Sequence, residues 1–138
     1  MDLLQIAIQA RKNAYAPYSN VKVGAAIKTG SGDIIIGSNI ENVRFGELIC
    51  AERNAIFNAY LNGERKLTEL AIVANYRGEL KPCRLCRSVI AELCPNIKIT
   101  TLNLNTKKIR KMDLKHLYKN TTSFEIRSVF RMLIRKIL

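Results

Sequence analysis

Several features that mark other classes of protein are missing from this sequence. No apolar stretch is long enough for a membrane-spanning helix, which argues against a chain embedded in a membrane. Residues 1–20 lack the ordered charged and apolar regions of a secretion signal, so export is not indicated. Internal repeats and low-complexity segments are also absent. We therefore expect a soluble cytoplasmic protein in which residues 1–138 form a single domain.

Acidic residues are scarce, with 11 Asp and Glu against 23 Lys and Arg, and the formal net charge is +12. The imbalance is concentrated in residues 107–138, which hold 10 of the basic residues and 2 of the acidic ones. Within this region, residues at about 123–138 place apolar and arginine side chains on separate faces of a predicted basic amphipathic helix. We expect it to pack on its own domain or on a neighbouring subunit. Contact with nucleic acid or an anionic membrane surface is the less favoured alternative.

Hydrophobic periodicity predicts an alternation of helices and strands. The expected helices cover residues 2–14, 50–62 and 83–93. The expected strands cover residues 21–28, 34–36, 70–73 and 97–104. The turn at residues 30–33 joins the first two strands into a hairpin. A hairpin followed by alternating strands and helices predicts a mixed sheet with helices packed on its faces, a layered α/β domain.

The four cysteines indicate a metal site more than disulfides, because the chain is expected to stay in a reducing compartment. Cys50 stands at the start of one predicted helix, and Cys83 and Cys86 open another. Helix N-termini favour the negative charge of thiolates, so two helix ends could converge on one ion. Three thiolates leave the fourth tetrahedral position of zinc for water, as a hydrolytic site requires. Cys94 lies about 12 Å along the helix from Cys86 and is predicted to be a buried core thiol.

The residues beside these cysteines suggest a catalytic role for the metal. Glu52 is the candidate proton shuttle, because Cys-x-Glu followed by Pro-Cys-x-x-Cys is the pattern of zinc deaminases. Three thiolates around Zn²⁺ carry a net negative charge, which opposes ionisation of a bound water molecule, so nearby cations should help to restore its acidity. Arg53 and Arg87 are the candidate donors to the thiolates. The alternative is that both are surface arginines on helix faces.

Further motifs resemble the small homotetrameric zinc-dependent cytidine deaminases. In chain order they are Ala16-Pro17-Tyr18-Ser19-Asn20, Val23-Gly24-Ala25-Ala26, Asn39-Ile40-Glu41-Asn42, Ile49-Cys50-Ala51-Glu52-Arg53-Asn54-Ala55-Ile56-Phe57, and Pro82-Cys83 with Cys86-Arg87. Their order and approximate spacing match the family over about residues 3–105. The resemblance implies a three-layer α/β/α fold with a mixed five-stranded sheet, one zinc ion per subunit and a homotetramer.

The resemblance also implies a reaction and a set of residue roles. The reaction is the hydrolytic deamination of cytidine and deoxycytidine to uridine and deoxyuridine, a step of pyrimidine salvage, with Glu52 moving the protons. Asn39 and Glu41 would hydrogen-bond the ribose, since an amide and a carboxylate together can hold hydroxyl groups. Backbone groups around Ala51 would hold the base. Phe124 would replace the family's aromatic residue that reaches a neighbouring subunit's active site.

Some positions depart from the family's pattern. The family has small residues between the second pair of cysteines and a glutamine after the following arginine, whereas this chain has Arg84, Leu85 and Ser88. Val21 replaces a common aromatic residue at the edge of the pocket. These changes bear on the activity level and the substrate preference. His116 is the only histidine, and we predict that it lies in a short helix as a surface or interface residue.

Three alternative functions remain open. The first is deamination of a cytosine-containing antibiotic, which Asn39 and Glu41 argue against because they suit a free ribose. The second is deamination of cytosine in nucleic acid, which suits the basic C-terminal region, although no aromatic-rich insert is present to bind the flanking bases. The third is a non-catalytic zinc-binding module, which would have no need for Glu52.

Overall fold

The computed structural model describes residues 1–44 and 47–119. The predicted helix at about 123–138 and Phe124 lie outside the described residues. The described helices are α1 (Leu3–Ala10), the 3-10 helix η1 (Arg11–Asn13), α2 (Ala51–Leu61), α3 (Arg84–Leu93) and α4 (Leu114–Tyr118). The strands are β1 (Val23–Thr29), β2 (Ile34–Ser38), β3 (Leu67–Ala74), β4 (Lys98–Asn103) and β5 (Lys108–Met112). None of the described helices is long and apolar enough to cross a membrane.

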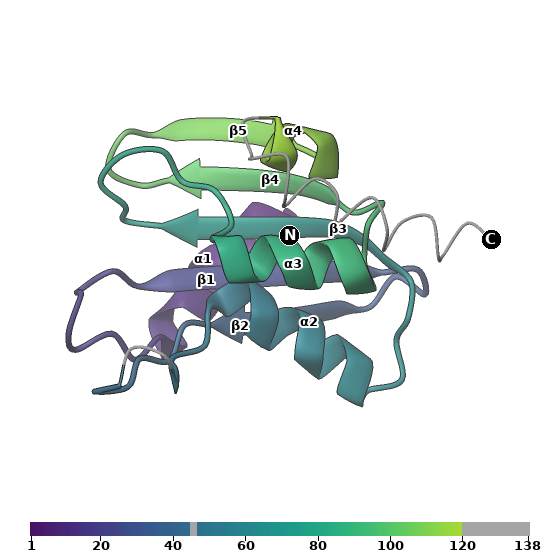
Figure 1. Ribbon diagram of the computed structural model, residues 1–138, viewed down its shortest axis with the longest axis horizontal. Helices are drawn as coiled ribbons and strands as arrows, with labels where there is room; N and C mark the ends of the chain where they lie inside the picture. The colour runs from purple at the N-terminus through teal and green to yellow at the C-terminus, as the bar shows by residue number, and fades with distance from the viewer. Residues whose placement is uncertain (45–46, 120–138) are drawn as a thin grey trace.

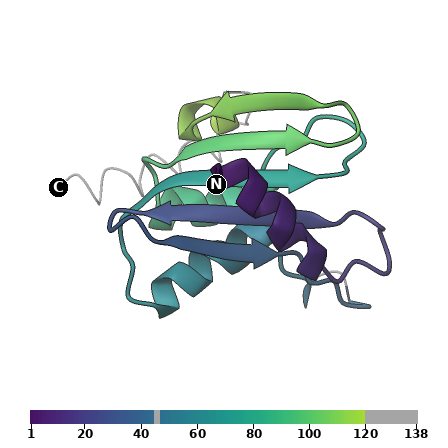
Figure 2. The same ribbon diagram turned by 180° about the vertical axis from the view of Figure 1, so that it is seen from behind.

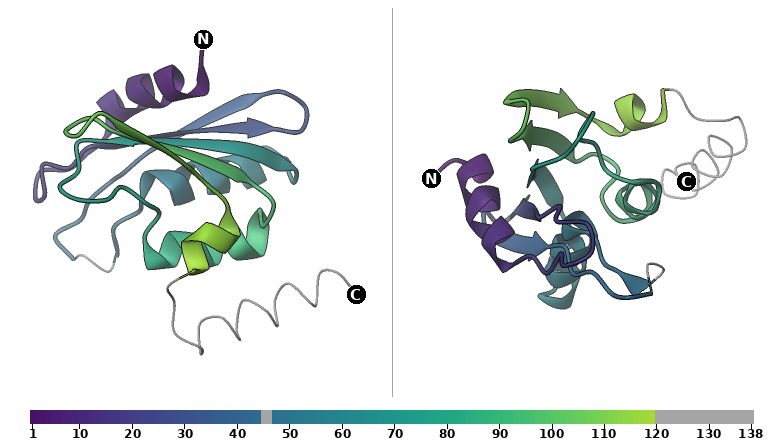
Figure 3. Two further views of the ribbon diagram at one scale, coloured as in Figure 1. Left: turned by 90° about the horizontal axis from the view of Figure 1, so that it is seen from above. Right: turned by 90° about the vertical axis from the view of Figure 1, so that its left-hand side faces the viewer.

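The strands form one five-stranded sheet in the order β2-β1-β3-β4-β5 (Figure 1). β3 and β4 are parallel, and the other neighbouring pairs are antiparallel. Helix α1 covers one face of the sheet (Figure 2), whereas α2, α3 and α4 lie on the opposite face (Figure 3). The predicted three-layer α/β/α architecture with a mixed five-stranded sheet is therefore confirmed.

Residues 70–74 of the central strand β3 are buried on both faces of the sheet, which explains their continuous apolar sequence. Leu70 and Ile72 belong to the larger core cluster, shared with α2 and α3. Ala71 and Val73 point the other way, into the cluster shared with α1. Full burial of a side chain such as Ile72 contributes roughly 1.5–3 kcal/mol. Cys94 is buried in the larger cluster, as predicted.

Both helices that carry metal-ligand candidates begin next to a cysteine, as the periodicity predicted. Cys50 is the N-cap of α2 and Cys83 is the N-cap of α3, and both have extended backbone angles. Helix α2 ends at Leu61. Gly63, just beyond the C-cap, has a positive φ of +82°, which suits a residue without a side chain. The two helix starts lie on the same side of the sheet (Figure 1).

The start of α2 rests directly on a glycine of β2. A Cβ atom at Gly37 would overlap the carbonyl oxygen of Ala51 and would lie 2.5 Å from the backbone nitrogen of Ala55. Both atoms belong to the backbone, so neither can move without the helix. The absence of a side chain at Gly37 therefore sets how closely the first turn of α2, with Cys50 beside it, approaches the sheet.

We expect Gly37→Ala to lower the free energy of unfolding by about 1–3 kcal/mol, because the added methyl group pushes α2 away from β2. Urea unfolding followed by circular dichroism measures the change. Ile36→Val, at a partly exposed position of the same strand, is the control and should stay within about 0.5 kcal/mol of the wild type. An unchanged unfolding midpoint for Gly37→Ala would show that α2 does not pack closely against this glycine.

Candidate active site

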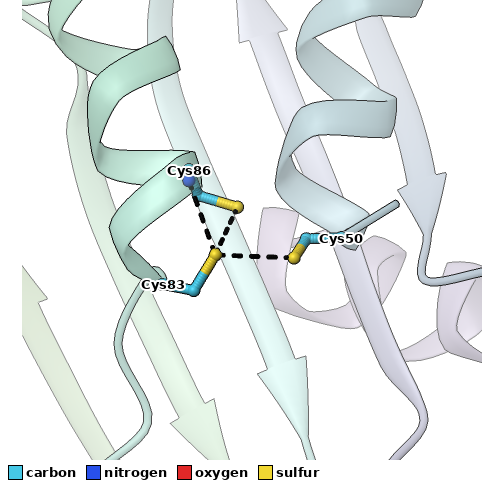
Figure 4. Close-up of side chains that lie close together, drawn as sticks. All are labelled: Cys50, Cys83 and Cys86. Atoms are coloured by element: carbon cyan, nitrogen blue, oxygen red, sulfur yellow. Dashed lines mark hydrogen bonds between the residues drawn. The ribbon is translucent and has the colours of Figure 1, made fainter. Parts of the chain in front are cut away.

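Three cysteines meet between the N-terminal ends of α2 and α3 (Figure 4). The Sγ atoms of Cys50 and Cys83 are 3.6 Å apart, and those of Cys83 and Cys86 are 3.3 Å apart. All three sulfur atoms lie within 4.8 Å of one another. Zinc–sulfur bonds of about 2.3 Å in tetrahedral geometry place ligand sulfurs about 3.8 Å apart. The spacing and the chemistry of this donor set therefore fit a zinc ion.

The three thiols lie close enough to shift one another's pKa values, and such a group favours a bound cation. Hydrogen bonding with the Cys50 and Cys86 thiols holds the pKa of Cys83 well below its ordinary value, and amide groups at the start of α3 act in the same direction. Contacts within the group raise the pKa values of Cys50 and Cys86. Zinc binds cysteine in its thiolate form, so a bound dication would displace the thiol protons.

Arg53 and Arg87, the two arginines predicted to donate to the thiolates, have different hydrogen-bond partners. Arg53 donates from Nη2 to the Cys50 sulfur at 3.4 Å and to the Leu48 carbonyl at the same distance. Burial alone would lower the pKa of Arg53, but its interactions with the thiols outweigh burial and raise it. Arg87 instead donates from Nη1 to the carbonyl of Leu117 in α4 at 3.0 Å. It also lies 5.8 Å from the ring centre of Tyr118.

Glu52 is a buried carboxyl group in the first turn of α2, with an exposed fraction of 6%. Burial raises the pKa of Glu52 to about 7, and the negative charge of Cys83 acts in the same direction. A carboxyl group with this pKa can both take up and release a proton near neutral pH. The position predicted for a proton shuttle therefore holds a group with suitable acidity.

A cavity of about 320 Å³ opens next to the cysteines. The predicted site residues on its wall are Asn39, Glu41, Cys50, Ala51, Glu52, Cys83 and Arg87. Cys86 and Arg53 are not lining residues, and they contact the other cysteines from within the protein. Val21, one of the departures from the family's pattern, also lines the cavity. The structure thus brings together residues that are more than 40 positions apart in the sequence.

Part of the cavity wall comes from the β3–α3 loop, which the sequence motifs did not predict. Tyr76, Glu79, Leu80 and Lys81 line the same cavity. One general signal pointed to them, because ligands of open α/β sheets bind beyond the carboxyl ends of the parallel strands, and this loop follows β3. The other departures, Arg84, Leu85 and Ser88, are exposed on α3 and do not line the cavity.

The two predicted ribose-binding residues are held firmly by the backbone. Asn39 accepts a hydrogen bond from the Val23 amide and donates one to the Val21 carbonyl, both at 2.8 Å. Glu41 accepts hydrogen bonds from the Tyr18 and Ser19 amides at 3.0 and 3.1 Å. Burial favours a higher pKa for Glu41, but these hydrogen bonds lower it overall. Each side chain retains some bonding capacity for a ligand, because a carboxylate has about four lone-pair sites and an amide group has two donors.

A buried amide anchors the loop that precedes Cys83. Asn103, at the end of β4, donates to the carbonyls of Tyr76 and Gly78 at 3.0 and 2.9 Å. Its Oδ1 accepts from the amides of Tyr76 and Asn105. The exposed fraction of Asn103 is 3%, so these bonds are shielded from water. Asn103 therefore fixes the loop that forms one wall of the cavity.

We expect Asn103→Asp to lower the free energy of unfolding by about 2–4 kcal/mol, because a buried carboxylate then faces two carbonyl oxygens. Zinc should also dissociate faster, since the loop leading to Cys83 loses its anchor. Thermal unfolding and zinc release to a chromogenic chelator measure the two effects. Asn96→Asp, at an exposed position outside this loop, is the matched control and should change little. Equal behaviour of the two variants would contradict the anchoring role.

Comparison with known proteins places this site in a family. The model described as "Cytidine and deoxycytidylate deaminase zinc-binding region" matches residues 1–101. The chain belongs to this family. The chain is thus an enzyme of a zinc-binding deaminase family, in agreement with the resemblance inferred from its motifs, and its three-cysteine group fits the family's metal.

Individual members of the family are similar over most of the described fold. The cytidine deaminase of Halalkalibacterium halodurans is 50% identical over 93 residues, which are 67% of this chain and 70% of that protein. The cytidine deaminase of Sporosarcina psychrophila is 48% identical over 86 residues, 62% of this chain and 63% of that protein. The crystal structure of cytidine deaminase from Burkholderia pseudomallei has 37% identity and a TM-score of 0.79, covering 87% of this chain and 96% of that one.

Proposed function

We propose that this protein catalyses the hydrolytic deamination of cytidine and deoxycytidine to uridine and deoxyuridine. The observation that carries the proposal is the position of Glu52, whose buried carboxyl group shares a cavity wall with Cys50 and Cys83. A metal site with a purely structural role has no need for an acid–base group of this kind. Relatives named cytidine deaminase support the choice of substrate.

Cys50, Cys83 and Cys86 are the residues that hold zinc in this proposal. When bound, the metal supplies Lewis-acid activation of a water molecule. Arg53 stabilises the negative charge of the thiolates through its contact with Cys50. Arg87, at the start of the same helix as Cys86, adds positive charge to the cavity wall.

Glu52 moves the protons of the reaction. Its carboxylate takes a proton from the attacking water and delivers it to N3 of the cytosine ring, while the water oxygen bonds to C4. The proton of the new C4 hydroxyl group then passes through the same carboxyl group to the exocyclic amine. The C4–N bond breaks, ammonia leaves, and the C4 carbonyl of uridine forms. Cytidine and one water molecule thereby give uridine and ammonia, without an oxidant or reductant.

The remaining wall residues position the nucleoside. Asn39 and Glu41 hydrogen-bond the ribose hydroxyl groups, since their own backbone contacts hold both side chains in place. Backbone groups at Ala51, the first residue of α2, hold the base. Val21 lines the same cavity and contributes an apolar contact.

The cellular setting and the assembly are part of the same proposal. We place the enzyme in the cytoplasm, in pyrimidine salvage, as a homotetramer with one zinc ion per subunit. Phe124 reaches the active site of a neighbouring subunit, and residues 1–138 make up one domain. The basic helix at about 123–138 packs on its own domain or on a neighbouring subunit.

The direct test is the ultraviolet absorbance of cytidine incubated with the zinc-loaded protein. We expect the cytosine band to disappear as uridine forms. Free cytosine, which lacks the ribose that Asn39 and Glu41 bind, should react far more slowly. An unchanged spectrum with zinc bound at one ion per chain would refute cytidine as the substrate. A cytosine-containing antibiotic and a cytosine-containing oligonucleotide would then be the compounds to assay.

A further inference from the structure

One aromatic side chain lines the active-site cavity. Among residues 1–44 and 47–119, Tyr76 is the only Phe, Tyr or Trp on the cavity wall, and its exposed fraction is 41%. Within the same residues, its hydroxyl group has no hydrogen-bond partner, because the bonds of Tyr76 all involve its backbone. No hydrogen bond of the described fold therefore accounts for a tyrosine at this position.

The register of the sheet places Tyr76 opposite Val21. Strands β1 and β3 are antiparallel, and their last pair at this end joins Val23 to Ala74. Continuing the same register by two residues brings Val21 and Tyr76 side by side. Both residues line the cavity, in agreement with this placement. Because valine is small, the ring of Tyr76 supplies most of the apolar surface at this part of the wall.

The alternation of side chains along β3 directs the Tyr76 ring towards the cavity. Alternate residues of the strand, ending at Ala74, belong to the core under α2 and α3. Asn75 faces the opposite side of the sheet, where its Oδ1 accepts from Arg11 Nη2 at 2.8 Å and from the Lys22 amide at 3.1 Å. Arg11 belongs to η1, which continues α1 (Figure 2). Tyr76, the next residue, therefore points to the side of α2 and α3, where the cavity lies.

Hydrogen bonds hold the backbone of Tyr76 from both sides. Its amide donates to Asn103 Oδ1 at 3.4 Å, and its carbonyl accepts from the side-chain amides of Asn103 and Asn105 at 3.0 and 3.3 Å. On the other side, Asn75 donates to the Asn20 carbonyl at 3.1 Å. The ring is thus carried by a fixed backbone, and little ordering is needed before it contacts a ligand.

Tyr76 lies on the side of the cavity that leads to the cysteines. Asn39 and Glu41, the proposed ribose contacts, follow β2, whereas Tyr76 follows β3, and β1 separates these two strands in the sheet (Figure 1). The loop that begins beside Tyr76 continues to Cys83. In the proposed reaction the cytosine ring lies between the ribose contacts and the cysteines, which places Tyr76 beside the base.

We infer that Tyr76 is a specificity-determining residue whose ring packs against the face of the pyrimidine of the bound nucleoside. The inference rests on the proposed function for the identity of the ligand. A planar aromatic base gains affinity from an aromatic side chain against its face, and alanine substitution of such a side chain weakens binding by roughly 5- to 100-fold. The contact favours an aromatic pyrimidine over a saturated, puckered ring that carries the same sugar.

The first test measures steady-state kinetics of cytidine deamination by the zinc-loaded full chain. Tyr76→Ala should raise the KM for cytidine by about fivefold or more and leave kcat within about threefold of the wild type, because the contact is made by substrate and transition state alike. Tyr76→Phe keeps the ring and should retain a KM within about twofold of the wild type. Tyr15→Ala, the same change at an exposed tyrosine outside the cavity wall, is the matched control.

The second test separates contact with the base from contact with the sugar. Uridine and 5,6-dihydrouridine carry the same ribose, but only uridine has a planar aromatic ring. Calorimetry should show that the wild type binds uridine more tightly, and that Tyr76→Ala loses about fivefold or more of this preference. Tyr76→Phe should keep the preference. Zinc content and the unfolding midpoint of each variant are measured alongside.

The outcomes separate this inference from the proposed function. An unchanged KM in Tyr76→Ala, a Tyr76→Phe variant as impaired as Tyr76→Ala, or an equal loss of affinity for uridine and dihydrouridine overturns the role of Tyr76. If Tyr76→Ala loses zinc or stability, Tyr76→Phe and the comparison of the two ligands decide instead. Failure of the wild type to deaminate cytidine refutes the proposed function, and the calorimetry then still tests Tyr76. Absence of uridine binding overturns the inference.

Discussion

Glu52→Gln should lower kcat for cytidine by about 10²- to 10⁴-fold, while the zinc content and the fold stay unchanged. The amide has nearly the same shape as the carboxyl group but cannot take a proton from water and pass it to the base. Because Glu52 is buried and is not one of the three sulfur ligands, its replacement leaves the metal site intact. Steady-state ultraviolet assays and metal analysis measure the two properties.

Glu69→Gln is the matched control for this variant. Glu69 is exposed on β3 and pairs with Lys28 at 3.6 Å, an arrangement that contributes little to stability. The control should therefore keep wild-type activity. If Glu52→Gln retained activity within tenfold of the wild type, Glu52 would not be the proton shuttle. If Glu52→Gln lost its zinc as well, the loss of activity would have to be assigned to the metal.

Cys83→Ser removes a proposed zinc ligand, so both the affinity for zinc and the activity should fall. The loss of affinity should exceed the roughly 10–100-fold seen when a residue that only hydrogen-bonds a zinc ligand is removed. The Cys83 sulfur contacts both Cys50 and Cys86, so it is central to the group. It also caps α3 by accepting from the Cys86 amide. Serine can still form that cap, so the variant separates metal binding from helix stability.

Cys94→Ala is the matched control on the same helix. Cys94 is buried in the hydrophobic core, so its truncation should cost stability without changing zinc binding. Competition with a chromogenic chelator and thermal unfolding distinguish the two effects. Wild-type zinc affinity in Cys83→Ser would exclude Cys83 as a ligand. Loss of zinc in Cys94→Ala would mean that the metal site extends into the core.

Local patterns in the sequence were enough to predict most of the helices and strands. The helices that begin beside Cys50 and Cys83, and the hairpin of β1 and β2, lie where periodicity predicted them. Side-chain burial repeats every 3.6 residues in a helix and every two in a strand, so each segment carries its own signal. The grouping of Cys50, Cys83 and Cys86 followed from the same reasoning, because thiolates favour helix starts.

Strand β5 was not predicted from the sequence pattern. Four of its five residues are exposed, Lys108 to Lys111, and only Met112 is partly buried. An edge strand of this kind has no apolar alternation of its own. Its position is set by backbone pairing with β4, which no local window of sequence contains.

The sequence by itself thus determined the layered α/β fold, the three thiols, and a glutamate next to them. The tertiary structure alone decided that Asn103 anchors the loop before Cys83, that Arg87 reaches α4, and that Tyr76 lies opposite Val21 on the cavity wall. Each of these depends on contacts between segments more than 20 residues apart. Hydrophobic periodicity records which face of a segment is buried, but not which distant segment it meets.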